Sequence, residues 1–350
     1  MKSFALANPK TIEQALSLLA SGRDGGARGG SRERVRILAG GQDLLTEMKE
    51  HLVEPETLVN LKGIAGLDRI EAAAVLASAP GAAQAGTAAD GLAIGALVTL
   101  DALERHAAGD ARWRMLAEAA RSIASPQIRS VGTVGGNLCQ RPRCWYFRNE
   151  HAKCLKKGGA ECLAYGGLNK YNAILGGGPS YIVHPSDLAP ALVASDARVV
   201  LRGARGERTL PLEEFFTLPS EGSVLRENVL AADEILTRVE VPAPARGRRS
   251  TYLKFKERGS YDFALVSVAL ALAVDAGKIS DARLVLGGVA PIPWRCGRTE
   301  KLLVGRSLDE ATSAAAAEDA LRDAEPLGHN AYKVPLARGL IRRAFQALAG

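Results

Sequence analysis

Residues 35–45 read Val-Arg-Ile-Leu-Ala-Gly-Gly-Gln-Asp-Leu-Leu, an apolar run that leads through a glycine pair into a second apolar pair. The run predicts a strand over 35–39, and a short helix is expected over 42–51. Glycine lets the backbone approach a ligand closely and adopt a positive φ, so successive N–H groups can point at a phosphate. A strand that passes into a helix start also favours an anion. The turn matches neither the dinucleotide fingerprint nor the P-loop, so an ordinary tight turn remains an alternative.

A second glycine turn follows about 90 residues later, where residues 130–137 read Ser-Val-Gly-Thr-Val-Gly-Gly-Asn. Its three glycines give the backbone the same freedom to approach a ligand. One such turn is more often structural than a phosphate site. Two in one chain are suggestive of a ligand that carries phosphate.

The residues around the first turn predict a small unit of helices and strands. Thr11 can cap a helix that carries Leu16 and Leu19 at helical spacing. A loop rich in Gly, Arg and Ser is expected over 21–34, and a second strand over 57–61. The opening unit therefore reads as helix, strand, glycine turn, helix, strand.

The remainder of the chain predicts two further regions. The Ala/Gly-rich stretch 63–90 indicates only strand and loop. A middle region follows with strands at 92–96, 198–201 and 234–241, and with helices at 111–124 and 187–194. Residues 242–249 read as an interdomain linker. A last region holds three strands and then two helices, expected at 250–256, 266–274, 281–289, 308–323 and 332–349.

Four of the five cysteines fall within 24 residues, at Cys139, Cys144, Cys154 and Cys162. Without a secretion signal, disulfide stapling of so long a chain is not expected. Structural zinc sites take ligands from short Cys-x2–4-Cys pairs, and only the first pair has that spacing. Four thiolates at wider spacing suit an iron–sulfur cluster held by loops, with free thiols as the alternative. Cys296 stands alone and is expected to be a core thiol.

Basic residues surround these cysteines and would offset the negative charge of a thiolate-ligated cluster; they are Arg141, Arg143, Arg148, Lys153, Lys156 and Lys157. The net charge of +7 is otherwise spread along the chain. Because no nucleic-acid reader motif accompanies it, an anionic ligand or an acidic protein partner explains this charge as well, and nucleic-acid binding is not expected.

No catalytic constellation is visible in the sequence. The five histidines are scattered, no pair has metal-ligand spacing, and no Ser-His-Asp elbow occurs. The chain is therefore expected to do no bond-making chemistry itself, which suits a redox relay whose cofactor does the chemistry. The longest apolar stretch, 264–274, is about half the ~20 residues that a membrane helix needs. The start of the chain lacks the apolar core of a signal peptide, so we expect a cytoplasmic protein without membrane insertion.

Taken together, these motifs resemble the flavoprotein (medium) subunit of the xanthine dehydrogenase family of molybdenum hydroxylases, which includes carbon monoxide dehydrogenase and bacterial aldehyde oxidoreductases. The resemblance covers essentially the whole chain. Besides the two glycine turns it rests on residues 184–192 (His-Pro-Ser-Asp-Leu-Ala-Pro-Ala-Leu), 233–236 (Asp-Glu-Ile-Leu) and 255–258 (Phe-Lys-Glu-Arg). It implies an α+β fold with a two-part FAD-binding region of the vanillyl-alcohol-oxidase/PCMH type, over 1–62 and 63–242. A C-terminal domain of sheet plus helices would occupy 249–350.

The same resemblance implies where FAD would bind. The two turns would hold the pyrophosphate and adjoining groups through backbone N–H groups, with Leu38, Ala39, Gly40, Gly41, Gln42, Asp43 and Leu44 in the first and Gly132, Thr133, Gly135, Gly136 and Asn137 in the second. Asp187 would bond a polar group of FAD, Ile235 would also line the site, and Lys256 would approach the isoalloxazine. From the residues alone, Asp187 reads equally as a helix cap and Lys256 as a solvated strand charge.

The cysteine-rich stretch, about 138–180, resembles the insertion that carries an additional [4Fe–4S] cluster in 4-hydroxybenzoyl-CoA reductase and some aldehyde oxidoreductases. In those relatives the ligands would match Cys144, Cys154 and Cys162, with a fourth cysteine near position 180. Here that position is Ser180. Three alternatives follow. Cys139 supplies the fourth thiolate, the cluster has a different fourth ligand, or the cluster is absent.

The resemblance implies an oxidoreductase subunit that passes electrons through FAD and a [4Fe–4S] cluster to an external acceptor. Its partners would be a large molybdopterin-binding subunit and a small subunit with [2Fe–2S] clusters, and the substrate pocket for an aldehyde, a purine or an aromatic compound would lie on another chain. A free-standing flavin oxidase with covalent FAD is the alternative, although neither turn contains His or Cys. A metal-binding interaction module without enzymatic activity is a third hypothesis.

Overall fold

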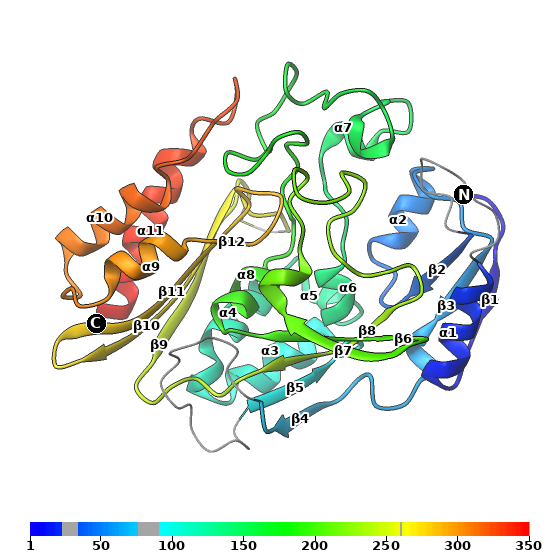
Figure 1. The fold of residues 1–350 in the computed structure, drawn as a ribbon, viewed down its shortest axis with the longest axis horizontal. Coiled ribbons are helices and arrows are strands. Elements are labelled where there is room, and N and C mark those ends of the chain that lie inside the picture. The colour runs from blue at the N-terminus through cyan, green and yellow to red at the C-terminus, as the bar shows by residue number, and fades with distance from the viewer. Residues whose placement is uncertain (23–33, 76–90, 260, 350) are drawn as a thin grey trace.

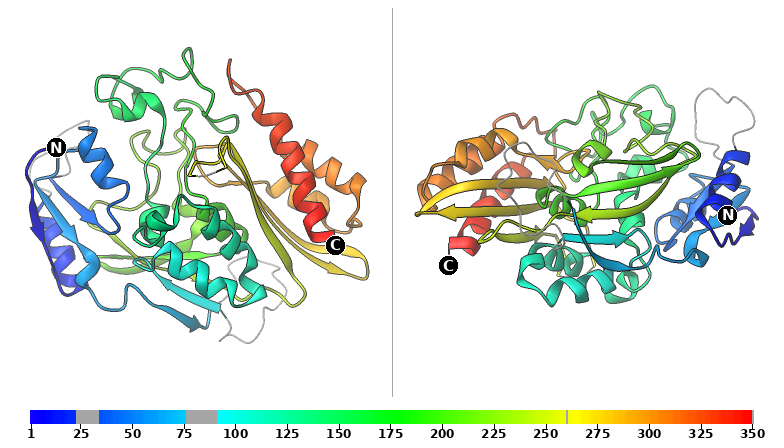
Figure 2. Two further views of the ribbon diagram at one scale, coloured as in Figure 1. Left: turned by 180° about the vertical axis from the view of Figure 1, so that it is seen from behind. Right: turned by 60° about the horizontal axis from the view of Figure 1, so that its bottom comes forward.

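The computed structural model describes residues 1–22, 34–75, 91–259 and 261–349. Three sheets follow one another along the chain, each with its own helices, and the predicted α+β class is confirmed (Figure 1). Seen from two further sides, the N-terminal and C-terminal sheets lie at opposite ends of the molecule with the middle sheet between them (Figure 2). The predicted loop 21–34 and the Ala/Gly-rich stretch 63–90 lie partly outside the described residues.

The N-terminal sheet is parallel and has the order β1-β3-β2. Its elements are β1 (Ala5–Ala7), α1 (Ile12–Ser21), β2 (Val35–Leu38), α2 (Leu44–Lys49) and β3 (Thr57–Asn60). As predicted, the side chain of Thr11 caps α1, where its Oγ1 accepts a hydrogen bond from Gln14 N at 3.2 Å. The first glycine turn thus stands at the carboxyl end of β2 and leads directly into α2.

The middle sheet is antiparallel, with the order β4-β5-β8-β6-β7. Its strands are β4 (Ile70–Ala73), β5 (Gly91–Gly95), β6 (Arg198–Gly203), β7 (Gly206–Pro211) and β8 (Ile235–Val241). The helices between them are α3 (Leu100–Ala108), α4 (Arg114–Ser122), α5 (Pro126–Arg129), α6 (Val134–Leu138) and α8 (Leu188–Ala194). The second glycine turn forms the start of α6. Single 3-10 turns occur at η1 (Leu61–Gly63), η2 (Ala111–Trp113), η3 (Leu155–Lys157) and η4 (Leu212–Phe215).

The C-terminal sheet is antiparallel and has the order β12-β11-β10-β9. Its elements are β9 (Arg249–Phe255), β10 (Val266–Asp275), β11 (Lys278–Gly287), β12 (Trp294–Arg295), α9 (Gly297–Leu303), α10 (Glu310–Ala320) and α11 (Lys333–Ala349). Figure 1 shows α9, α10 and α11 along one face of this sheet. Cys296 is buried there, as predicted.

The long apolar stretch seen in the sequence forms β10, which is buried on both faces. Val268 and Leu270 pack with α10 and α11, whereas Ala269 and Ala271 pack with the core of the middle region. Alternate residues of a strand point to opposite faces, so a strand between two helical layers is apolar throughout. Among the described residues, no helix combines the length and the apolar character needed to cross a membrane.

Residues 139–187, here called the cysteine segment, join α6 to α8 and contain little regular structure apart from α7 (Trp145–Arg148). The C-terminal domain holds the end of this segment. The ammonium of Lys333, which is fully buried, donates to the carbonyls of Tyr171 at 2.9 Å, Asn172 at 3.1 Å and Gly288 at 2.7 Å. The segment is therefore attached to the C-terminal domain as well as to the helices that flank it.

Candidate functional site

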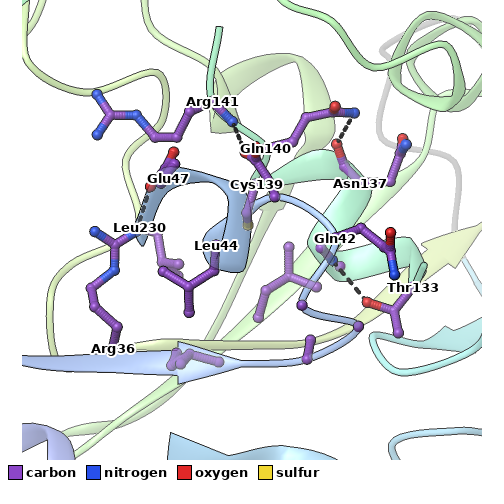
Figure 3. A pocket seen from close by; sticks show the side chains of 18 of the residues that line it. Arg36, Gln42, Leu44, Glu47, Thr133, Asn137, Cys139, Gln140, Arg141 and Leu230 are labelled. Carbon is purple, nitrogen blue, oxygen red and sulfur yellow. Dashed lines mark hydrogen bonds and ion pairs between the residues drawn. The ribbon is translucent and has the colours of Figure 1, made fainter. Parts of the chain in front are cut away.

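A cavity of about 1200 Å³ lies where the N-terminal and middle regions meet, and both glycine turns line it. Every residue predicted for the cofactor site lines this cavity except Leu38 and Lys256. Leu38 is the last residue of β2 and packs instead with Met48 and Leu58. Lys256 follows the end of β9 and is half-buried. Figure 3 shows Gln42 and Leu44 of the first turn together with residues of the second turn and α6 around the pocket.

The first turn presents backbone donors. Gly41 has φ +74°, a left-handed conformation that side chains rarely adopt. Within the described part of the chain, none of the backbone N–H groups of residues 40–44 donates a hydrogen bond to the protein. Successive unpaired N–H groups ahead of a helix form a concavity for an anion. This turn can therefore hold a phosphate.

The second turn uses its backbone donors inside the protein. Val134 N donates to Val98 O at 2.9 Å, and Gly135 N donates to Ala96 O at 2.8 Å. Gly136 N donates to the Oγ1 of Thr133, the N-cap of α6, at 3.2 Å. Residues 132–137 were expected to offer backbone N–H groups to a ligand, as residues 38–44 were, but the N–H groups of residues 134–136 are bonded within the protein. The second turn forms a wall of the cavity.

Glycine in each turn permits close packing against neighbouring parts of the chain. A Cβ added to Gly40 would lie 2.4 Å from the carbonyl oxygen of Val131, which precedes the second turn's first glycine. A Cβ on Gly135 would lie 2.9 Å from the Cβ of Ala96. These glycines are required for the approach of backbone to backbone. That role differs from the close approach to a ligand that the sequence suggested.

Asp43 joins the first turn to the cysteine segment. Its carboxylate accepts hydrogen bonds from Arg141 N at 2.7 Å, Arg143 Nη1 at 2.5 Å and Arg148 Nη2 at 2.8 Å. Burial alone would raise the pKa of Asp43, but Arg143, Arg148 and the Arg141 N–H outweigh it and hold that pKa below its ordinary value. Asp43 is therefore an ionised anchor of the cavity wall.

Glu227 makes the corresponding connection on another wall, formed by residues 223–232. Its carboxylate lies between two cations of the cysteine segment, with Arg141 Nε at 2.8 Å and Lys156 Nζ at 2.7 Å. The basic residues of the segment were expected to offset a cluster's charge. Arg141, Arg143, Arg148 and Lys156 instead pair with carboxylates around the cavity.

Asp187 faces the cavity at the junction with the C-terminal domain. Lys254 Nζ donates to its carboxylate at 2.7 Å and Tyr252 Oη donates at 2.8 Å, both from β9. The side chain of Asp187 does not cap α8; the Oγ of Ser186 accepts from Ala189 N at 2.9 Å instead. The cap alternative for Asp187 is therefore excluded. The lysine of β9 that reaches this carboxylate is Lys254, two residues before Lys256.

Cys139 lines the cavity, whereas the other three clustered cysteines do not. It lines the cavity beside Gln140 and Asn137 (Figure 3), and its nearest charges belong to Arg36 and Glu227. Burial raises the pKa of its thiol to about 12. The place of Cys139 in the cavity wall therefore differs from that of the other three clustered cysteines.

The other three clustered thiols, Cys144, Cys154 and Cys162, contact residues within the cysteine segment. Cys144 and Cys154 are near enough for their charges to interact, and Lys157 is near both. Asn172 Nδ2 lies 3.8 Å from the sulfur of Cys144 and donates to Tyr181 O at 2.9 Å, while Cys162 lies near the Tyr181 side chain. Across the described residues, no three His, Cys, Asp or Glu side chains are arranged to hold a metal ion.

Sequence reasoning missed several residues of the cavity. Glu47 is 1% exposed, lies 3.8 Å from Arg36 and 3.9 Å from Arg148, and lines the cavity from α2. Tyr261, Asp262 and Phe263 line it from the loop after β9. Glu47 has the sequence context of an ordinary helix residue, and the 223–232 wall has no turn or repeat signal. Their positions depend on tertiary contacts alone.

Comparison with known proteins gives matches along the whole chain. Residues 2–244 match the family model of the FAD binding domain in molybdopterin dehydrogenase, and residues 250–348 match that of the CO dehydrogenase flavoprotein C-terminal domain.

Among curated relatives, the aldehyde oxidoreductase FAD-binding subunit PaoB of Escherichia coli is 34% identical over 307 residues, which cover 87% of this chain and 88% of that protein. The carbon monoxide dehydrogenase medium chain of Hydrogenophaga pseudoflava is 29% identical over 345 residues, covering 97% and 94%. Among solved structures, the reconstituted CO dehydrogenase from Oligotropha carboxidovorans gives a TM-score of 0.73 at 26% identity and covers 99% of this chain and 97% of that one.

Proposed function

Since the chain belongs to the family of the FAD binding domain in molybdopterin dehydrogenases, we propose that it is the electron-transferring flavin subunit of a molybdenum hydroxylase complex. It would receive electrons that originate at a molybdenum centre on another subunit and pass them to an external acceptor. The observation that supports this most is the cavity, which both glycine turns line and where the first turn offers unpaired N–H groups.

The residues present fit FAD as a ligand. The N–H groups of residues 40–44 would bind the pyrophosphate, because unpaired donors at a helix start favour a phosphate. Thr133 and Asn137 would orient adjoining groups through their side chains, and Asp187 would accept from a polar group. Bound FAD supplies the electron-carrying chemistry, while the protein binds and orients it. The complete oxidation of a substrate would need the partner subunits.

We favour noncovalent FAD over the covalent flavin of a free-standing oxidase. Cys139 is the cysteine that lines the cavity, and its thiol is protonated at neutral pH because burial raises its pKa to about 12. A thiol is a weak nucleophile, whereas the thiolate attacks readily. Purified protein should therefore show a flavin spectrum, and denaturation should release all of the flavin. Absence of flavin after reconstitution with FAD would refute the proposal, and flavin retained after denaturation would support the oxidase.

We further propose that the cysteine segment binds a [4Fe–4S] cluster through Cys144, Cys154 and Cys162. Cys144 lies near Cys154 and Asn172, Lys157 lies near both of these thiols, and Cys162 lies near Tyr181. Among the described residues the three thiols are not arranged around a single metal ion, so the proposal rests on their sequence pattern and on these contacts. Thiolates of loop residues are the usual ligands of such clusters. Cys139 is the less supported fourth ligand, since it faces the cavity, and the surroundings of Ser180 are the other source.

Iron and acid-labile sulfide analysis of anaerobically prepared protein tests the cluster. About four irons per chain are expected, with loss of iron in Cys154→Ala and Cys162→Ala. Cys139→Ala should keep its iron if the fourth ligand comes from the surroundings of Ser180. Zinc alone, or no metal, would refute the cluster, and a zinc-binding chain without flavin would support the non-enzymatic metal-binding module.

The partners follow from what the relatives are called, since several carry the names of medium chains or FAD subunits. We propose a large molybdopterin-binding subunit and a small [2Fe–2S] subunit, assembled in the cytoplasm. Affinity purification from the native host, with identification of co-purifying chains and metals, tests this. A chain that purifies alone and oxidises aldehydes or purines without molybdenum would contradict it.

A further inference from the structure

The cysteine segment contacts two walls of the cavity that lie far apart in the sequence. The first wall is the turn before α2, where Asp43 accepts from Arg141, Arg143 and Arg148. The second wall is formed by residues 223–232, in which Glu227 pairs with Arg141 and Lys156 of the segment. Both carboxylates themselves line the cavity. The segment that carries the cysteines therefore also holds the walls of the flavin cavity.

Arg141 contacts both walls. Its backbone N donates to Asp43 Oδ2 at 2.7 Å, and its guanidinium binds Glu227 at 2.8 Å and the carbonyl of Leu225 at 2.9 Å. The guanidinium also stacks 4.8 Å from the ring centre of Phe147, in the cysteine segment. Figure 3 shows Arg141 above Glu47 and Cys139 at the edge of the pocket. A planar guanidinium with several donors suits such a bridge better than an ammonium does.

The ion pair between Arg141 and Glu227 is largely buried, so its loss should weaken the attachment of the wall to the segment. The side chains of Arg141 and Glu227 are 15% and 6% exposed. Removing one partner of a buried ion pair leaves the other charge without compensation. Lys156 would still pair with Glu227 from the same segment, so the wall would loosen without being released. The wall 223–232 would then be held less firmly relative to the first turn, by Lys156, which also donates to the carbonyls of Val224 at 2.8 Å and Arg226 at 3.3 Å.

We propose that Arg141 is a positioning residue of the flavin site, through which the order of the cysteine segment and the affinity for FAD are coupled. This rests on the proposed function, because it takes FAD as the occupant of the cavity. Coupling between two sites is reciprocal. Bound FAD should therefore protect the cysteine segment from opening, and opening of the segment should weaken FAD binding by the same factor.

The experiment compares Arg141→Met with Lys153→Met in the full-length protein. Lys153 is an exposed lysine of the same segment, so the control removes an equal charge without touching the bridge. Titration of FAD into deflavinated protein gives the dissociation constant from flavin fluorescence. Arg141→Met should bind FAD at least about tenfold more weakly than the wild type, as couplings of this kind allow, and Lys153→Met should bind like the wild type.

Limited proteolysis separates positioning from a general loss of stability. FAD should slow cleavage within residues 149–168 of the wild type and of Lys153→Met, and should do so far less in Arg141→Met. Arg141→Lys should restore part of the affinity, since an ammonium can still reach Glu227 but cannot also bind Leu225 O. If Arg141→Met fails to fold, Glu227→Gln, which weakens the same pair at constant size, takes its place.

The outcomes are distinguishable. Wild-type FAD affinity in Arg141→Met, or FAD protection of the segment that is equal in all variants, would overturn the coupling and leave the flavin subunit intact as a proposal. A wild-type chain that does not bind FAD would instead refute the proposed function.

Discussion

At the scale of single residues, Gly40 and Gly135 permit close packing within the protein as well as any approach to a ligand. Gly40 lies against the backbone of Val131, and Gly135 lies against Ala96. Gly41, by contrast, is required for its own conformation, with φ +74°. Close contact between the turns brings the unpaired donors of the first beside the side chains of the second. The geometry of the cavity therefore depends on residues that lack side chains.

Gly40→Ala should separate the two turns. Its Cβ would lie 2.4 Å from Val131 O, a backbone atom that cannot rotate away. We expect a loss of stability of about 1–3 kcal/mol, as for other overpacked sites, together with a loss of FAD affinity. Gly166→Ala is the matched control, because nothing lies within 4 Å of the Cβ that it adds. Urea unfolding and FAD titration measure the two effects, and equal behaviour of both variants would contradict this reading.

His184 should make the protein sensitive to mild acid. Burial lowers its pKa from 6.5 to about 4, so the folded protein keeps the ring neutral against Phe216 while the unfolded chain takes up a proton below pH 6.5. The folded pKa is the lower of the two, so this contribution to stability is fully present above pH 6.5 and is lost as pH falls towards 4. The difference between the folded and unfolded pKa values corresponds to about 3 kcal/mol of unfolding free energy.

His184→Gln should remove that pH dependence. Unfolding free energies measured in urea at pH 7, 5.5 and 4.5 should fall less steeply for the variant than for the wild type. If the unfolding free energies of the variant and the wild type fall in parallel with pH, other groups are responsible for the acid sensitivity.

At the scale of elements, prediction succeeded where a local pattern fixes the structure. Thr11 caps α1, apolar spacing marks α4, and the continuous apolar run marks β10. The edge strand β7 was missed because its first residues are exposed and show no alternation. The three-residue β1 and the short helix α9 are too brief for a period to be visible.

The same holds for the candidate site, where residues in local motifs could be predicted and contacts between distant segments could not. The glycine turns and Asp187 could be found because each is a local motif. The pairing of Arg141 with Glu227 could not be found, since 86 residues separate the two and neither lies in a periodic element. The pairing of Lys254 with Asp187 could not be found either, since 67 residues separate the two.

Gly339→Ala should stabilise the C-terminal helix. Gly339 is exposed within the 17-residue α11, and a Cβ there would meet nothing within 4 Å. Alanine removes the entropic cost of glycine inside a helix, which is worth about 0.5–1 kcal/mol. The midpoint of urea unfolding should rise with FAD affinity unchanged. A lower midpoint would mean that α11 needs the freedom of glycine at this position.

At the scale of the whole molecule, the C-terminal domain completes the core of the middle region. Tyr252, Ala269 and Val285 of its sheet belong to the same apolar cluster as α4 and α8. Two buried ion pairs cross this boundary, Asp187 with Lys254 and Asp196 with Arg283, at 2.7 and 2.8 Å. Asp187 also lines the cavity, so the boundary between the domains reaches the cavity.

Lys254→Met should therefore affect both stability and flavin binding. The two side chains of its pair with Asp187 are only 4% and 5% exposed, and the ammonium also donates to the carbonyls of Ser122 and Asp262. Removal of one partner leaves a buried carboxylate without its cation, which costs about 3–5 kcal/mol. Because Asp262 lines the cavity as Asp187 does, we expect weaker FAD binding as well.

The double variant Lys254→Met with Asp187→Asn distinguishes a charge effect from a packing effect. If the uncompensated carboxylate causes the loss, removing it should recover most of the stability lost in Lys254→Met, because the two residues are in contact and their effects are not additive. FAD affinity should stay low in the double variant, since Asp187 itself faces the cavity. Equilibrium unfolding in urea and FAD titration provide the two measurements. Additive losses of stability would indicate that Lys254 acts through Ser122 and Asp262, and that the pair with Asp187 does not hold the two domains together.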